Sequence, residues 1–319
     1  MPISEAYPMV SLNAVKPRPV SHCIILEELH ERALGLDMVG VKILSKDEIK
    51  EKEPYCKIEN ALYVPQAGVV DYKLVTESLA NKFISMGGEI RFFQEIHDIE
   101  SKGGIKSFSS KEETFNAEFL INCAGLYSDT VAALDNIETK LRIIPFRGEY
   151  FTINPSKSNY VNNMIYPIAD PDLPFLGIHL TKTISGNIEA GPNAVIAFAK
   201  EGYEWKDVRL KELSRTVFYG GMWKLGKKYF KTGVSEMYRS LNKKVFLKEI
   251  SSFIPDIVEK DLEPRISGVR AQAVDKDGNL LDDFIFEDGN QSLHVLNAPS
   301  PAATSSLAIG EYITRKILN

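Results

Sequence analysis

The chain has 319 residues, of which 44% are hydrophobic and 25% are charged, and its net charge is −5. This length favours two domains with a sizeable core, and the charge gives no general attraction to nucleic acid. No apolar run approaches the roughly 18 residues that span a bilayer. Cys23, Cys56 and Cys123 are too few and too widely spaced for a disulfide framework or a zinc site. We therefore expect a protein of a reducing compartment, the cytoplasm, with no metal centre.

The first part of the chain is expected to form two helices after a leader. Residues 1–23 contain several prolines and no clear period, so we interpret them as a loose leader. A helical period of apolar residues begins at Ile24. A second, shorter helix is expected after Ser45, because Ser45 and Glu48 have the spacing of a capping box.

A helix, a strand pair and a buried strand are expected next. Asp71 has the right position to cap a helix that stops at Gly87. The following residues predict a strand pair around Gly103 that includes Ile96. Residues 117–125 form a nearly continuous apolar run that ends in glycine, which is typical of a buried strand before a tight turn. Helices that alternate with strands in this way indicate an α/β layer.

The residue pattern of the sequence changes at Ile143. Strand-like segments broken by Pro, Asn and Gly follow it and predict an antiparallel sheet. Residues 206–252 read as helical, with interruptions expected at Gly220, Gly226 and Gly233.

Four short segments carry a family resemblance: NCAGLYSD (122–129), PFRGEYF (145–151), GVRAQAV (268–274) and NAPSPAATSS (297–306). Their order and chemistry resemble the D-amino-acid-oxidase (DAO) superfamily of FAD-dependent oxidoreductases. Within it the chain is most similar to the L-2-hydroxyglutarate dehydrogenases or oxidases, above all over residues 164–203. The resemblance runs from about residue 26 to the end of the chain. It implies a mixed α/β and α+β fold, with a Rossmann-like FAD/NAD(P)-binding domain and an antiparallel-sheet substrate domain with helices.

The chain departs from this family at its start. The family's first βαβ unit carries a glycine fingerprint that brings backbone amides close to the pyrophosphate, and no G-x-G-x-x-G occurs in the 319 residues. We expect an incomplete FAD-binding domain over 68–143 and 265–319. The substrate domain is expected over 24–67 and 144–264, after the leader at 1–23, which has no family match.

Arg270 is the first candidate for a substrate contact. Oxidation of a 2-hydroxy acid requires its carboxylate to be held firmly, and a guanidinium does so with two parallel hydrogen bonds. In related oxidases an arginine in a G-[LV]-R segment has this role, and Gly268, Val269 and Arg270 match that segment. The alternative is an arginine that pairs with a structural carboxylate, such as Asp282 or Asp283.

The resemblance implies that the turn before the last helix lies against the flavin pyrimidine. This turn supplies six candidate cofactor contacts, namely Pro299, Ser300, Pro301, Ala302, Ala303 and Thr304. Backbone amides at a helix start would stabilise the negative charge that a reduced flavin carries. The alternative is an ordinary N-cap, in which Ser300 or Thr304 satisfies free N–H groups of the helix.

Further cofactor contacts are expected at three other places. The strand-end turn Cys123-Ala124-Gly125 would let the backbone approach the ribityl chain or a phosphate; alternatively, Gly125 only serves a left-handed turn. Gly268 opens the arginine segment. Ile96 matches a family position that packs on adenine, and apolar core is the other interpretation.

His179, Arg147, Tyr150 and Tyr166 are the remaining site candidates. His179 lies in an apolar strand and could accept the hydroxyl proton of the substrate, or it could be a structural histidine bonded to backbone. Arg147 could reach the second carboxylate of a diacid, although we favour a bracing role. Tyr150 and Tyr166 could line the substrate pocket, whereas tyrosines in strands usually serve packing. No role is assigned to the other four histidines, among them His294.

Residues 222–248 contain eight basic residues and one acidic residue, a balance of +7 (8 − 1), interleaved with aromatic residues. They form either a solvated helix face or a surface for peripheral contact with the inner membrane and its quinones.

The function expected from these features is FAD-dependent oxidation of L-2-hydroxyglutarate to 2-oxoglutarate, with electrons passing to oxygen or a quinone. Two alternatives stay open. The chain could be a truncated, inactive remnant or a mis-started fragment that acts at most as a binding module. It could also be an FAD oxidase of another 2-hydroxy acid or of an amino acid.

Overall fold

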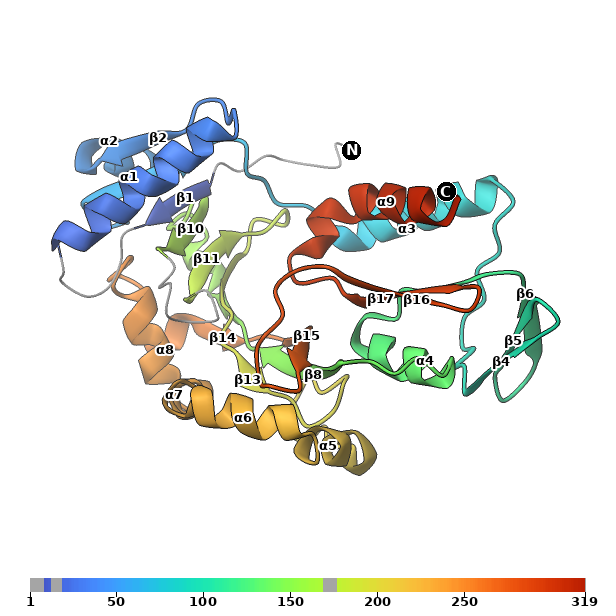
Figure 1. Ribbon diagram of the computed structural model, residues 1–319. Helices are drawn as coiled ribbons and strands as arrows, with labels where there is room; N and C mark the ends of the chain where they lie inside the picture. Colours follow the sequence, from blue (N-terminus) through green and yellow to red (C-terminus); the bar gives the residue numbers. More distant parts are fainter. Residues whose placement is uncertain (1–8, 13–18, 169–176, 319) are drawn as a thin grey trace. The chain divides into compact units, whose positions relative to one another are not determined.

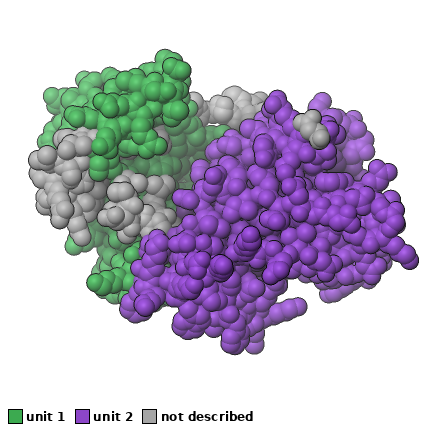
Figure 2. Space-filling model, in the orientation of Figure 1, with its two compact units in different colours: residues 1–78, 148–195, 231–268 green, residues 79–147, 196–230, 269–319 purple. Residues whose placement is uncertain are grey.

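The computed structural model describes residues 9–12, 19–168 and 177–318, and Figure 1 shows its helices and strands. The chain divides into two compact units (Figure 2), each assembled from three stretches. Unit 1 comprises residues 1–78, 148–195 and 231–268, and unit 2 comprises residues 79–147, 196–230 and 269–319. The main difference from the expected division is that residues 196–230 cluster with unit 2. None of the helices within the described ranges is long and apolar enough to cross a membrane.

Unit 1 is built on an eight-stranded sheet in the order β14-β9-β12-β11-β10-β1-β3-β2. Its strands are β1 (Met9–Leu12), β2 (Lys42–Ser45), β3 (Asn60–Val64), β9 (Phe151–Ile153), β10 (Met164–Pro167), β11 (His179–Lys182), β12 (Ile188–Gly191) and β14 (Leu262–Pro264). Neighbouring strands are antiparallel except β1 and β10, which run parallel. The expected antiparallel sheet is therefore confirmed.

The interpretation of residues 1–23 as a loose leader is wrong at two places. Residues 19–23 begin the helix α1 (Pro19–Gly35). Met9–Leu12 form β1, which pairs with β3 on one side and with β10 on the other. Met9 lies opposite Val64 and also opposite Met164. Both partners are distant in sequence, so no local pattern could reveal this strand.

The helices of unit 1 are α1 (Pro19–Gly35), α2 (Lys46–Lys52), α7 (Phe230–Leu241) and α8 (Lys243–Ile250). In β3, Ala61 belongs to the cluster that contains Ile250 of α8, whereas its neighbour Leu62 packs with Leu26 of α1. Side chains of a strand point to opposite faces in turn, so β3 contributes to a core on each face of the sheet. The expected capping box is confirmed, since the Glu48 carboxylate accepts hydrogen bonds from the backbone N–H and hydroxyl of Ser45.

Unit 2 contains a parallel strand pair. Strand β7 (Leu120–Asn122) runs parallel to β17 (Ser292–Asn297), which pairs antiparallel with β16 (Ile285–Gly289). The final helix α9 (Ser306–Leu318) covers this sheet, because its Ile313 packs with the buried Leu293 and Val295 of β17. Helix α4 (Ser128–Leu134) follows β7 after a short 3₁₀ turn, η1 (Gly125–Tyr127).

A separate meander of β4 (Asp98–Lys102), β5 (Ile105–Ser109) and β6 (Thr114–Ala117) follows α3 (Tyr72–Ser85). Asp71 caps α3 as expected, accepting from the backbone N–H of Lys73 at 2.9 Å. The strand pair is confirmed around Gly103, but it starts at Asp98. Ile96 therefore lies before the first strand, contrary to the prediction that placed it within the pair.

A short sheet in the order β13-β8-β15 also belongs mainly to unit 2. Its strands are β8 (Leu141–Gly148), β13 (Val195–Ile196) and β15 (Gly268–Asp275). Helices α5 (Leu210–Val217) and α6 (Gly220–Lys228) belong to the same unit. The expected helix breaks at Gly226 and Gly233 are wrong, because these glycines lie inside α6 and α7. The breaks occur at residues 218–219, 229 and 242.

Candidate functional site

Two of the predicted cofactor segments lie at one edge of the parallel strand pair in unit 2. His294 of β17 is in register with Asn122 of β7, and both strands run in the same direction. The turn Cys123–Gly125 leaves β7 and the turn Pro299–Thr304 leaves β17, so both follow the carboxyl ends of parallel strands. That edge is where open α/β sheets bind their ligands. The structure thus brings these two segments to a common place.

The turn after β7 is exposed and its backbone is accessible. Cys123, Ala124 and Gly125 are all exposed. Gly125 has φ of +55°, a left-handed conformation that favours glycine. Apart from Gly125 and its two chain neighbours, no atom of the described residues lies within 4 Å of where a Cβ at Gly125 would stand. The glycine therefore serves a left-handed turn, as one of the two interpretations had it, and it also leaves the backbone open to a ligand.

The turn before α9 does not have an ordinary side-chain cap. It contains the 3₁₀ helix η4 (Ala302–Ser305), and Pro301 at its N-cap position makes no side-chain cap hydrogen bond. The Thr304 hydroxyl donates to the carbonyl of Pro301 at 2.8 Å, and within the described residues no backbone N–H donates to this hydroxyl. This geometry does not match the N-cap alternative at Thr304.

Small, exposed residues at this edge fit the approach of a flavin dinucleotide. Ala124, Ala298 and Ala303 are exposed and carry only a methyl group each, so a planar ring or a ribityl chain can come close to the backbone. Small residues of this kind are compatible with the parts of FAD that the family resemblance assigns to this edge. Two other cofactor candidates lie elsewhere: Ile96 is half-buried ahead of β4, and Gly268 is exposed at the start of β15.

A buried polar network stands directly behind the exposed turn. The Asn122 amide nitrogen donates to the carbonyl of Ser128 at 2.9 Å and lies 3.0 Å from Nδ1 of His294. The Asn122 amide oxygen accepts from the backbone N–H of Ala124 at 3.0 Å. Nε2 of His294 lies 3.0 Å from the carboxylate of Asp135. The side chain of Asn122 thereby connects the turn to the interior of unit 2.

Lys106 and Ser292 complete this network. The Lys106 ammonium forms an ion pair with Asp135, and the Ser292 hydroxyl donates to the same carboxylate at 2.6 Å. The side chains of Lys106, Asp135 and His294 are only 1%, 3% and 0% exposed. Buried ionisable groups of this kind need a complete set of partners.

The electrostatics of the network favour a neutral imidazole beside an ionised carboxylate. Burial lowers the pKa of His294 below its ordinary value, although the hydrogen bond and charge of Asp135 oppose this effect. Burial alone would raise the pKa of Asp135, but hydrogen bonds from Lys106, Ser292 and His294 outweigh it and lower that pKa. No role was expected for His294 from the sequence. Its only signal in the sequence is a histidine that stands between the apolar residues Leu293 and Val295.

Arg270 lies on β15 and is half-buried. Among the residues that the structure describes, its guanidinium has no hydrogen bond or ion pair with a carboxylate. Asp283 instead accepts from the backbone N–H of Phe284 at 2.7 Å. The structure therefore does not contain the alternative, an ion pair of Arg270 with Asp282 or Asp283.

His179 stacks on Tyr166 within unit 1. Their ring centroids lie 4.3 Å apart at an interplanar angle of 20°. Nδ1 of His179 lies 3.3 Å from the carbonyl oxygen of Gly177, and burial raises the pKa of Tyr166. The two candidates are thus brought together on β10 and β11. The backbone contact is also the one that the structural interpretation of His179 expected.

Arg147 and Tyr150 occupy different surroundings. Arg147 is buried on β8, with its guanidinium carbon 4.3 Å from the ring centre of Trp205, a cation–π contact within unit 2. Tyr150 lies between β8 and β9, and its carbonyl accepts from the backbone N–H of Arg265 at 3.1 Å. The favoured role of Arg147, bracing of the domain junction, stays a prediction.

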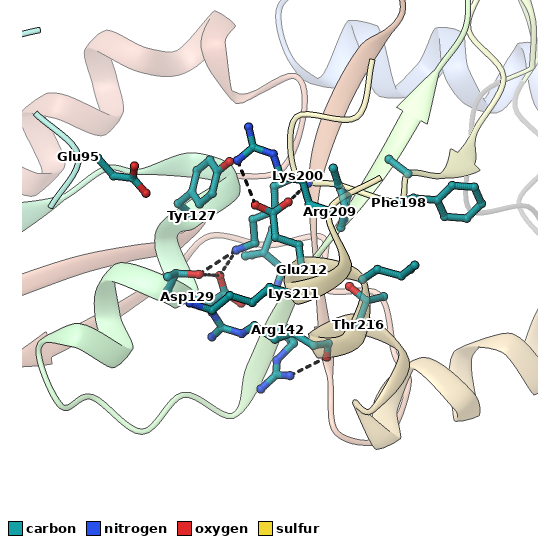
Figure 3. A pocket seen from close by; sticks show the side chains of 17 residues that line it. Glu95, Tyr127, Asp129, Arg142, Phe198, Lys200, Arg209, Lys211, Glu212 and Thr216 are labelled. Carbon is teal, nitrogen blue, oxygen red and sulfur yellow. Dashed lines mark hydrogen bonds and ion pairs between the residues drawn. The ribbon is translucent and has the colours of Figure 1, made fainter. Parts of the chain in front are cut away.

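A cavity of about 310 Å³ lies within unit 2, lined by charged residues of several elements (Figure 3). Lys200 reaches Asp129 at 2.6 Å and the Thr130 hydroxyl at 3.0 Å. Burial lowers the pKa of Lys200, and the charge of Asp129 partly offsets this. Glu212 accepts from the backbone N–H of Lys200 at 2.7 Å. The buried side chains of Lys200 and Asp129 therefore form an ion pair in the wall of this cavity. No group of residues able to hold a metal ion occurs in the described ranges.

Two dehydrogenases are similar in sequence to this chain. An L-2-hydroxyglutarate dehydrogenase of Indibacter alkaliphilus is 46% identical over 90% of this chain and 72% of its own length. The mitochondrial L-2-hydroxyglutarate dehydrogenase of Bos taurus is 40% identical over 92% of this chain and 67% of its own length.

Solved structures share the fold. The L-alpha-glycerophosphate oxidase of Mycoplasma pneumoniae, solved with FAD bound, matches 99% of this chain and 74% of its own with a TM-score of 0.73 and 18% identity. The glycine oxidase of Geobacillus kaustophilus matches 98% of this chain and 72% of its own with a TM-score of 0.64 and 15% identity. The family described as FAD dependent oxidoreductase (DAO) matches residues 22–316. The chain belongs to the DAO family of FAD-dependent oxidoreductases.

Proposed function

We propose that this protein oxidises L-2-hydroxyglutarate to 2-oxoglutarate with FAD as its cofactor. The observation that carries the proposal is the 46% identity to an L-2-hydroxyglutarate dehydrogenase over 90% of the chain. The common edge of β7 and β17 supports it, because the small and exposed residues that the resemblance assigns to FAD lie there. The oxidation removes a hydride from C2 of the substrate and a proton from its hydroxyl group.

Bound FAD supplies the two-electron acceptor of this reaction. The residues proposed to hold it are those of the two turns in unit 2, with Gly268 and Ile96 as further contacts. Because Cys123, Ala124 and Gly125 are exposed, they can offer backbone groups to the cofactor. The start of the helical segment at Ala302 adds backbone amides, which favour negative charge nearby.

Arg270 is proposed to bind a carboxylate of the substrate. Its guanidinium has five N–H donors in a planar fork, which matches the two oxygens of a carboxylate. No carboxylate in the described part of the chain occupies this fork, so it does not need to leave a protein partner before it binds substrate. A fixed carboxylate restricts the orientation of C2, which is the main requirement of an oxidation at that carbon.

His179 is proposed to take the hydroxyl proton. If Nδ1 donates to the Gly177 carbonyl, the neutral ring carries its lone pair on Nε2, which is then the basic atom. The stacked ring of Tyr166 holds the imidazole plane. Tyr150, Tyr166 and Arg147 stay candidates for the wall of the substrate pocket.

Oxygen or a quinone is proposed as the final electron acceptor. A quinone would require peripheral contact with a membrane, and residues 222–248 are the proposed surface. In unit 2, Trp223 and Phe230 are both 69% exposed near Lys224 and Lys227. Exposed aromatic and basic side chains together suit a membrane interface.

The test is a turnover assay of the purified protein with added FAD. L-2-Hydroxyglutarate should reduce a dye acceptor and yield 2-oxoglutarate, whereas the D enantiomer and 2-hydroxy acids without the second carboxylate should react far more slowly. A protein that binds FAD but prefers another 2-hydroxy acid or an amino acid would overturn the proposed substrate.

A further inference from the structure

We propose that His294 is a positioning residue for the cofactor turn. In its neutral form it holds the Asn122 amide in the one orientation that fixes residues 123–128, and protonation of its ring releases that turn. The link to FAD rests on the proposed function, but the effect on the turn is a property of unit 2 itself.

The hydrogen bonds of Asn122 define the tautomer of His294. The Asn122 oxygen faces the backbone N–H of Ala124, a group that can only donate. The Asn122 nitrogen must then donate its two hydrogens to the Ser128 carbonyl and to Nδ1 of His294. Nδ1 is therefore an acceptor, and the ring proton sits on Nε2, where it donates to Asp135.

This arrangement satisfies every polar atom of the Asn122 side chain. Its oxygen has one donor, and its two N–H bonds have one acceptor each. The amide has only one other planar orientation, which exchanges its oxygen and nitrogen. In that orientation the nitrogen faces the N–H of Ala124 and the oxygen faces the carbonyl of Ser128, so both turn contacts become repulsive.

Protonation of His294 forces this conflict. An imidazolium carries a hydrogen on both ring nitrogens, so Nδ1 changes from an acceptor to a donor. The Nδ1–H of His294 then faces the amide N–H of Asn122, and two donors repel each other in a site from which water is excluded. Either the Asn122 amide turns and loses its hydrogen bonds to Ala124 and Ser128, or β7 and β17 separate locally.

The groups that face His294 determine when this occurs. Asp135, at the end of α4, faces its Nε2, and the charge of Asp135 favours protonation. Lys106 of β5 opposes protonation through its charge, whereas Glu287 of β16 favours it. Ser292 of β17 lies 3.2 Å from Nε2 and is neutral. Burial is the largest influence, and it favours the neutral ring at neutral pH.

The turn that His294 controls contains residues proposed to contact FAD. Ala124, whose backbone N–H donates to the Asn122 amide oxygen, lies between the exposed Cys123 and the left-handed Gly125. Ser128, the other anchor, donates its hydroxyl to the Leu296 carbonyl of β17 at 3.0 Å, so it joins the two strands at the cofactor edge. Loss of the Asn122 contacts would thus disorder one wall of the proposed cofactor site.

The decisive experiment compares His294→Gln with His294→Leu. A glutamine amide can accept from Asn122 through its oxygen and donate to Asp135 through its nitrogen, and it does not titrate between pH 5 and 8. Leucine removes both hydrogen bonds. The matched control is His97→Gln, which changes an exposed histidine just before β4.

Amide hydrogen exchange of peptides covering residues 123–128 is the first readout, measured without FAD. Cys123, which is exposed, gives a second readout through its alkylation rate, resolved by peptide mass spectrometry. At pH 7.5 we expect amide exchange in this turn to be roughly tenfold faster in His294→Leu than in the wild type, because one or two net hydrogen bonds are lost. In His294→Gln the exchange rate at this pH should be nearly unchanged, because the hydrogen bonds are kept. At pH 5 the wild type should exchange faster than His294→Gln, while the His97→Gln variant follows the wild type.

Equal exchange of the wild type and His294→Gln at both pH values would overturn the proposal. If His294→Leu does not fold, the comparison of the wild type with His294→Gln still decides, because it needs only the conservative variant. FAD affinity measured across the same pH range is a separate arm. If the turn loosens at low pH but FAD affinity does not follow, the placement of the cofactor is wrong and the positioning role of His294 stands.

Discussion

The amide of Asn122 and the imidazole of His294 lie 3.0 Å apart across the parallel strands β7 and β17, although 172 residues separate them in the chain. This contact connects an exposed turn of the proposed cofactor site with a buried ion pair of unit 2. On one side it leads to the Ala124 N–H, and on the other to the Asp135–Lys106 ion pair. A change of charge in the interior can therefore reach the surface turn through two side chains.

The His294 site makes stability depend on pH. The folded-state pKa of His294 lies below its ordinary value near 6.5. Above pH 6.5 the ring is neutral in both states, so its full contribution to stability is present. As the pH falls below 6.5, the unfolded chain takes up the proton first, and stability is lost until the pH reaches the folded-state pKa. Urea unfolding at pH 7.5 and 5.5 should therefore show a larger decrease for the wild type than for His294→Gln; equal decreases would contradict this account.

Replacement of Arg270 by lysine should lower kcat/KM for L-2-hydroxyglutarate by more than about tenfold, about 1.4 kcal/mol of transition-state stabilisation. Lysine keeps the charge but loses the planar fork that binds both carboxylate oxygens. Steady-state kinetics would check this, with Arg315→Lys as control, since Arg315 pairs with Glu311 on the exposed side of α9. A loss smaller than tenfold would remove Arg270 from the substrate site.

Replacement of His179 by glutamine should lower kcat by roughly 10²- to 10⁴-fold, the usual contribution of a general base. The acid limb of the pH profile of kcat/KM should disappear with it. His30→Gln is the control, because His30 is another histidine of unit 1 whose ring contacts a backbone carbonyl, that of Val41 at 3.3 Å. An unchanged pH profile in His179→Gln would mean that the ring only packs against Tyr166.

The thiols of Cys56 and Cys123 should differ in reactivity. Burial raises the pKa of Cys56 to about 12, with a further contribution from the charge of Glu53. At pH 8 only roughly one Cys56 thiol in ten thousand is then ionised, and the thiolate is the reactive form. Alkylation followed by mass spectrometry should modify Cys123 in the native protein and Cys56 only after unfolding. Comparable native rates would show that the unit 1 core opens readily.

The core of unit 1 should be sensitive to truncation at Leu180. This side chain is fully buried between β10 and β12, in the cluster that includes Ile165 and Ile250. Leu180→Ala should lower the free energy of unfolding by about 2–5 kcal/mol through lost contacts and a cavity. Ile184→Ala, on the exposed loop that follows, should change it by less than about 0.5 kcal/mol. Urea unfolding of both variants would check this contrast.

Local patterns in the sequence predicted the elements that depend on neighbours in the chain. Three such predictions are confirmed: the helix N-cap at Asp71, the capping box of Ser45 and Glu48, and the antiparallel sheet after Ile143. These features need only a few adjacent residues, whose spacing carries the information.

Features that depend on distant partners could not be predicted in this way. Strand β1 exists because Met9–Leu12 pairs with residues 49 to 55 positions away in β3 and 155 positions away in β10. The role of His294 depends on Asn122, Asp135 and Lys106, which come from three other elements. The resemblance indicated the two cofactor turns, but it gave no sign of the network that holds one of them.

Anaerobic mixing of the FAD-loaded protein with L-2-hydroxyglutarate tests the central claim most directly. We predict that the flavin absorbance near 450 nm is bleached and that one 2-oxoglutarate forms for each flavin reduced, as hydride transfer to a bound flavin requires. A protein that carries FAD but keeps its full absorbance with this substrate would contradict the claim.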